Sequence, residues 1–222
     1  MRYIFSLFFI FYSVTVVAQI AIIKDVDGYT NVRSKASLES DIIFKIKDNK
    51  AFWYDHSVKD TTDWILVYIP KNDFSLGCSD YNLIEGFIHK SRLLPIRGLD
   101  EYTNSDFKFS YVLGSFNSTN RVIEKISNRS IKLIDGQSFW GTDGELPTVE
   151  IKSINVNLKG LDIEIHKAFY NNLFECDNDF TIYEQNETFF IYQDNSDGAG
   201  YYQVLWVINK NGLIQRLVGT IY

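Results

Sequence analysis

Between residues 20 and 96, short runs of strand-forming residues alternate with turn signals, and this pattern leaves little choice of fold class. The first turn is Asp27-Gly28, where glycine accepts a positive φ angle without steric cost. Asp48-Asn49 and Pro70 end two later runs. The predicted strands occupy residues 29–33, 42–46, 51–56, 63–69 and 86–89. Five short strands so closely spaced predict a small all-β barrel.

Four pieces of this region carry a resemblance in their order and spacing. They are Asn-Val-Arg-Ser at 31–34, Ile-Ile at 42–43, Trp64 at the start of a strand, and Gly-Phe-Ile-His-Lys-Ser-Arg-Leu at 86–93. Together they make residues 20–96 similar to the bacterial SH3 family. The resemblance implies an SH3-like barrel that binds cell-wall peptides.

Three departures from the family pattern affect the ligand groove more than the fold. Lys35-Ala36 stand where the family usually has Gly-Pro, and Phe87 replaces the usual Trp or Tyr. A long polar insertion, residues 71–85, precedes the closing strand.

Aromatic residues are more abundant in this region than so small a barrel can hide. Shallow aromatic grooves bind extended peptides or sugars through stacking and main-chain hydrogen bonds. The predicted ligand-binding residues are Tyr29, Asn31, Arg33, Trp53, Trp64 and Phe87. We expect at least one of the two tryptophans to belong to the core instead. Arg33 either pairs with a ligand carboxylate or braces the loop that follows it.

The N-terminal segment has the pattern of a secretory signal peptide. Arg2 precedes an apolar run over residues 4–17, and cleavage after Ala18 would leave Gln19 as the new terminus. The alternative, a membrane anchor, requires a longer run. With no cysteine near the cut, a lipid has no attachment point. We expect a periplasmic or secreted protein with no membrane anchor after cleavage.

Charge excludes some partners. Residues 20–98 carry balanced charge, whereas residues 99–222 hold 10 basic and 17 acidic residues. Nucleic acids and anionic lipid surfaces attract clustered lysine and arginine, which the acidic half lacks. We therefore expect no nucleic-acid partner.

The pattern breaks at residues 95–101, which predicts domains at 19–98 and 99–222 that pack together. The second is predicted to be mostly β, a sandwich or closed barrel, with one short helix at 167–174. Lys159-Gly160 and Asn211-Gly212 mark two of its hairpins. No family is identified for this half.

Catalytic chemistry has weak candidates in this half. Cys176 and His166 are its one nucleophile-type pair, but the NlpC-type peptidases that the resemblance suggests place cysteine before histidine. The three histidines of the chain are too scattered for a zinc site. A carboxylate pair needs a deep cleft, so the loop acids are interpreted as solvated: Asp143, Glu145, Asp177 and Asp179.

Two further features leave alternatives open. Residues 194–198 resemble part of a calcium loop but fail the EF-hand pattern, so a polar hairpin loop is favoured. Residues 196–202, with two glycines, are interpreted as a flexible turn or as a loop that inserts into a partner. Cys78 and Cys176 either form a disulfide between the domains or stay unpaired.

The sequence thus favours an exported, non-enzymatic binding protein whose SH3-like domain binds a peptidoglycan peptide or an envelope protein. No catalytic residue, metal ligand or cofactor is predicted. The alternatives are an envelope hydrolase with an unrecognised C-terminal active site, and an inhibitor or interaction protein that acts through residues 196–202.

Overall fold

The computed structural model describes residues 19–56, 62–74, 82–127 and 130–220. Of these residues 53% are in strands and 8% are helical, and none of their helices reaches seven residues. The predicted all-β class is therefore confirmed. The predicted signal peptide, residues 1–18, lies outside the described residues, as does Cys78.

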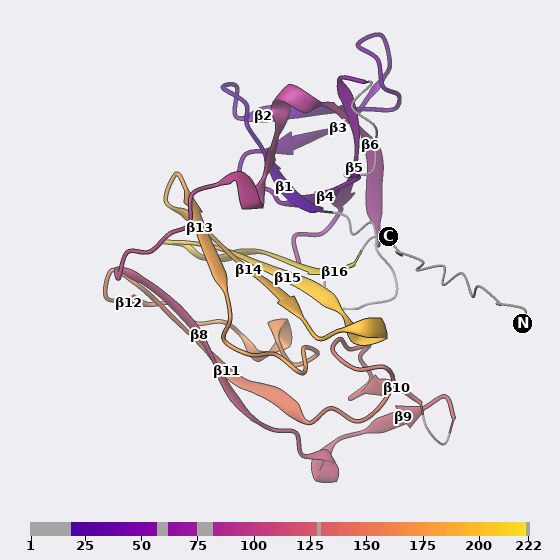
Figure 1. Ribbon diagram of the computed structural model, residues 1–222, viewed down its shortest axis with the longest axis vertical. Coiled ribbons are helices and arrows are strands. Elements are labelled where there is room, and N and C mark those ends of the chain that lie inside the picture. Colours follow the sequence, from indigo (N-terminus) through magenta and orange to yellow (C-terminus); the bar gives the residue numbers. More distant parts are fainter. Residues whose placement is uncertain (1–18, 57–61, 75–81, 128–129, 221–222) are drawn as a thin grey trace, which may run out of the picture.

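The first half, residues 19–98, forms one antiparallel sheet in the strand order β3-β2-β6-β5-β4-β1-β7. Figure 1 shows this sheet curling around its own interior. In β5, Ile65, Val67 and Ile69 are buried in that interior, while the residues between them are half-buried. The strands are β1 (Gln19–Ile23), β2 (Tyr29–Arg33), β3 (Ile42–Lys47), β4 (Phe52–Tyr54), β5 (Trp64–Pro70), β6 (Leu83–His89) and β7 (Leu93–Pro95); the 3-10 turns are η1 (Lys90–Arg92) and η2 (Ile96–Gly98).

Sequence patterns predicted β2 to β6 but missed β1, which pairs with both β4 and β7. The sequence of β1, Gln-Ile-Ala-Ile-Ile, has no alternation because both of its faces are covered. Ala21 and Ile23 face the interior of the first half. Ile20 and Ile22 belong to a second cluster, shared with the other half of the chain.

The second half contains three antiparallel sheets, with strand orders β12-β11-β8, β13-β14-β15-β16 and β10-β9. Its elements are β8 (Phe107–Ser115), η3 (Ser118–Asn120), β9 (Ile123–Lys125), β10 (Ile131–Ile134), β11 (Val149–Leu158), β12 (Leu161–Asp162), η4 (Lys167–Phe169), β13 (Thr181–Gln185), β14 (Thr188–Asn195), η5 (Gly198–Gly200), β15 (Tyr202–Asn209) and β16 (Gly212–Gly219).

The three-stranded and four-stranded sheets pack face to face (Figure 1), which is the sandwich alternative of the sequence prediction. Aromatic side chains fill the space between them. Phe107 of β8 stacks on Phe189 of β14 with ring centroids 4.0 Å apart. Trp206 of β15 donates a 2.8 Å hydrogen bond from Nε1 to the hydroxyl of Tyr111.

The predicted helix at 167–174 is reduced to η4, one 3-10 turn. Contacts with a distant loop replace the helical hydrogen bonds that would have continued it. The amide of Trp140 donates to the carbonyl of Asn172, and the amide of Phe174 donates to the carbonyl of Trp140. Tertiary pairing therefore overrides local helix propensity here.

The four-stranded sheet is the middle layer of the molecule, because its other face packs against β1 and β4 of the first half (Figure 1). Trp53 of β4 is fully buried in this shared cluster, together with Leu205 and Val207 of β15. The side-chain amide of Gln215 adds two hydrogen bonds to the backbone of Ala51, one to each peptide group. The two halves therefore share one apolar core.

Candidate functional site

The outward face of β2, β6 and β5 carries most of the residues predicted to bind a ligand. Tyr29, Asn31 and Arg33 lie on the outer side of β2, because the residues between them are buried. Trp64 of β5 pairs with His89 of β6 on the same face. These five side chains line a hollow of about 380 Å³, hereafter the strand-face hollow.

The six predicted ligand-binding residues divide into three groups. Tyr29, Asn31, Arg33 and Trp64 line the strand-face hollow. Phe87 is half-buried and pairs with Arg33, but it does not line the hollow. For Trp53 the ligand-binding prediction is wrong, because its side chain is fully buried between the two halves.

Arg33 braces the loop that follows β2, which was one of its two expected roles. Its Nη1 donates a 2.7 Å hydrogen bond to the carbonyl of Ser40. The partner is a backbone carbonyl rather than a carboxylate, so the side chain keeps its charge at the edge of the hollow. The same interaction fixes the position of the guanidinium group in advance of any ligand.

Sequence reasoning missed another part of the hollow's lining, which is formed by the end of β6 and the segment that follows it. His89 packs edge-on against Trp64, with ring centroids 5.7 Å apart, and its Nδ1 lies 2.8 Å from Ser91 Oγ. Arg92 forms a 3.0 Å ion pair with Asp25, whose side chain is only 5% exposed. The period-two alternation that placed Phe87 outward also places His89 outward, and this signal was available.

The chemistry of the strand-face hollow suits recognition of a polar chain. Tyr29 and Trp64 offer ring faces, and Lys45 lies over the Tyr29 ring at 4.4 Å. The strand-face hollow is also lined by both cationic and anionic side chains, namely Arg33, Arg92, Asp25 and Asp27. Such a surface binds by stacking and hydrogen bonding.

The structure buries Cys176, the candidate nucleophile of the hydrolase alternative. Cys176 is 5% exposed, and its sulfur lies 2.9 Å from the hydroxyl of Tyr202. Burial raises the pKa of the Cys176 thiol from 9.0 to about 12, so it stays protonated at neutral pH. His166 is exposed and accepts a hydrogen bond from the amide of Ala168 at the start of η4. The thiol is free in the structure, and Cys78, the other partner of the disulfide alternative, lies outside the described residues.

We predict that Cys176 resists alkylation in the folded protein. A rise in pKa from 9.0 to about 12 lowers the thiolate fraction at pH 8 by about three orders of magnitude, and burial adds a steric barrier. Mass spectrometry of the Cys176 peptide after iodoacetamide treatment, with and without denaturant, measures this. Equal labelling in both conditions would reveal an accessible nucleophile and restore the hydrolase hypothesis.

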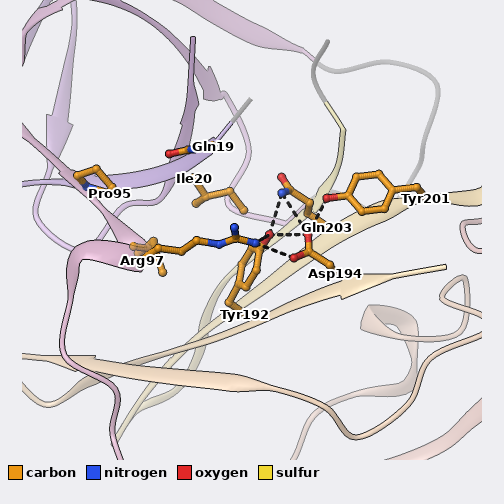
Figure 2. Close-up of a pocket in the computed structure, with 9 residues that line it drawn as sticks. Gln19, Ile20, Pro95, Arg97, Tyr192, Asp194, Tyr201 and Gln203 are labelled. Carbon is orange, nitrogen blue, oxygen red and sulfur yellow. Dashed lines mark hydrogen bonds and ion pairs between the residues drawn. The ribbon is translucent and has the colours of Figure 1, made fainter. Parts of the chain in front are cut away.

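Residues 194–202, considered above as a calcium loop or an insertion loop, are held within the protein. The Asp194 carboxylate accepts hydrogen bonds from Arg97, Tyr192 and Tyr201 (Figure 2). Ser196 Oγ donates to the carbonyl of Gly141 at 3.0 Å. Among the described residues, no group of three His, Cys, Asp or Glu side chains is placed to hold a metal ion.

Comparisons with known proteins add no family. No protein-family model matches this chain. A search of the curated proteins also finds no match. The resemblance to bacterial SH3 domains therefore rests on the motifs at residues 31–34, 42–43, 64 and 86–93. Within the described part of the chain, no helix is long and apolar enough to cross a membrane.

Proposed function

We propose that this protein is an exported, non-enzymatic binding protein, and that its first half is an SH3-like module. Its ligand is a peptide of the cell wall or, as the alternative, an envelope protein. Residues 1–18 act as the signal peptide, so that the mature chain starts at Gln19. The second half carries the module and shares its core.

The observation that carries this proposal is the gathering of four predicted residues at one hollow. Tyr29, Asn31 and Arg33 come from one strand, and Trp64 comes from a strand that is not its neighbour. Residues 31–34 and 64 also carry the resemblance to a peptide-binding family. Their common surface supports a shared role in binding.

The charges around the hollow support a peptide rather than an apolar ligand. Arg33, whose charge is not neutralised by any carboxylate among the described residues, matches an acidic group, while Asp27 at the same hollow matches an amine. A wall peptide carries both kinds of group. Tyr29 is 38% exposed, so part of its side chain is open to a ligand.

Co-sedimentation of residues 19–222 with purified peptidoglycan tests the proposal, and Trp64→Ala is the decisive variant. A central aromatic contact in an interface contributes about 2 kcal/mol or more, so we expect affinity to fall by about 30-fold or more. Circular dichroism checks that the variant is folded.

Ile126→Ala is the matched control, because Ile126 is 73% exposed on the second half, outside the strand-face hollow. It should bind as the wild type does. Saturable binding that survives both Trp64→Ala and Tyr29→Ala would place the wall site elsewhere. Absence of wild-type binding would remove the wall peptide and leave an envelope protein as the ligand to capture.

A further inference from the structure

A second hollow, hereafter the seam hollow, lies where the two halves of the chain meet (Figure 2). Gln19 of β1 and Arg97 of η2 line it from the first half. Tyr192 of β14 and Gln203 of β15 line it from the second. Its volume is about 190 Å³. Junctions between packed units are common positions for small-molecule sites.

A hydrogen-bond network centred on Asp194 forms one wall of the seam hollow. Tyr192 and Tyr201 donate their hydroxyl protons to Asp194 Oδ1 at 2.5 and 2.6 Å. Burial, together with the carboxylate, raises the pKa of both hydroxyls, so they remain donors. Arg97 Nη2 donates to Asp194 Oδ2 at 2.7 Å and to the Tyr192 hydroxyl at 3.0 Å.

The side-chain amide of Gln203 belongs to the same network, but only its nitrogen forms hydrogen bonds there. Nε2 donates to the Tyr192 hydroxyl at 2.8 Å and to Asp194 Oδ1 at 3.3 Å. This fixes the amide orientation, since a reversed amide would place its oxygen against the carboxylate. Gln203 is 5% exposed, and its Oε1 has no hydrogen-bond partner among the described residues. Figure 2 shows Oε1 pointing away from Tyr192 and Asp194.

A buried acceptor without a partner lowers stability by about as much as the loss of a hydrogen bond. A ligand that donates a hydrogen bond to Oε1 would recover this free energy. Arg97 supplies the complementary group. Both of its hydrogen bonds leave from Nη2, and Nε and Nη1 are further donors on the same side chain. This wall therefore offers one acceptor, Gln203 Oε1, and donors on Arg97. A complementary ligand has both a hydrogen-bond donor and a hydrogen-bond acceptor.

We propose that the seam hollow binds a neutral, polyhydroxylated molecule about the size of one sugar ring. A hydroxyl group donates to Gln203 Oε1, and a neighbouring oxygen accepts from Arg97. Ile20 and Pro95 supply apolar contacts for the C–H face of the ring. The volume of the hollow, about 190 Å³, suits a small molecule rather than a polymer.

The charges of the site disfavour a carboxylate ligand. Asp194 already neutralises Arg97, and negative charge added beside it would be repelled. The paired N–H groups that bind a carboxylate in bidentate fashion both include an Nη2 donor, and Nη2 is occupied. A neutral hydroxyl group accepts a hydrogen bond from a single N–H group, and Nε and Nη1 of Arg97 can each provide one.

Nuclear magnetic resonance titration of ¹⁵N-labelled residues 19–222 tests the proposal, with D-glucose and N-acetyl-D-glucosamine as probes and sodium acetate as the anionic comparison. We expect at least one sugar to shift the Gln203 side-chain amide and Arg97 Nε–H signals saturably. The dissociation constant should be about millimolar, as is typical of ligands with about a dozen non-hydrogen atoms. Acetate should leave these signals unchanged.

Gln203→Met and Arg97→Gln should each weaken sugar binding by about three- to tenfold, the effect of one hydrogen bond. Lys210→Gln, which removes an exposed positive charge at the β15–β16 turn, should not. Saturable shifts in the wild type support the site even where a variant unfolds. Absence of a response to both sugars, binding unaffected by both variants, or binding of acetate instead would overturn the proposal.

Discussion

Replacing Trp53 with alanine is expected to lower the free energy of unfolding by about 3–5 kcal/mol, the usual cost of truncating a fully buried tryptophan. Trp53 has no exposed surface, and it packs against Leu205 and Val207 across the junction of the halves. Urea denaturation followed by circular dichroism measures the change. Because the two halves share this core, we expect a single transition at lower urea concentration.

Trp64→Ala is the control for this experiment, because the chain provides a second tryptophan on a neighbouring strand of the same sheet. Trp64 is half-buried and contacts His89 at the surface, so its loss should cost about 1–3 kcal/mol, from partial burial and one aromatic contact, which is less than for Trp53. The two variants are therefore expected to behave oppositely, with Trp53→Ala losing stability and Trp64→Ala losing binding. Equal destabilisation would contradict the placement of Trp53 in the shared core.

Replacing Gly141 with alanine should also destabilise the fold strongly, by about 2–5 kcal/mol. Gly141 has φ +111°, where other residues are strained. A Cβ atom would meet the backbone carbonyl of Phe174, and backbone cannot yield as a flexible side chain does. Thermal unfolding measures the effect, at about 2–4 °C for each kcal/mol in a chain of this size.

Gly136→Ala separates backbone strain from the steric clash as causes of the destabilisation by Gly141→Ala. Gly136 also has a positive φ angle, +74°, but no atom lies within 4 Å of the position that its Cβ would take. Only the backbone strain remains there, and it should cost about 1–2 kcal/mol. If Gly141→Ala proved no worse than Gly136→Ala, the close approach of Gly141 to Phe174 would be ruled out.

The shared core has a consequence for function, because the seam hollow depends on it directly and the first half that carries the strand-face hollow packs against the second half through it. The strand-face hollow lies on the outward side of β2, β6 and β5, and the inner side of the same sheet belongs to the first half's own interior. The seam hollow exists only while Arg97 and Gln203 are held together by the packing of the halves. For this reason the experiments above use point variants of the mature chain rather than isolated halves.

Local sequence patterns were sufficient to predict the all-β class and to identify much of the lining of the strand-face hollow. In a strand, successive side chains point to opposite faces, so residues two apart share a face. That rule places Tyr29, Asn31 and Arg33 together without knowledge of the fold. Turn residues such as Asn211-Gly212 likewise end strands through their own backbone preferences.

Tertiary packing decided the rest, because local patterns do not say which face another part of the chain will cover. Trp53 was assigned to the ligand surface, but the second half buries it, and β1 lost its alternation for the same reason. The helix expected at 167–174 gave way to hydrogen bonds with Trp140, far away in sequence. Arg97 and Asp194 are joined only because two sheets meet, and such long-range contacts leave no local signal in the chain.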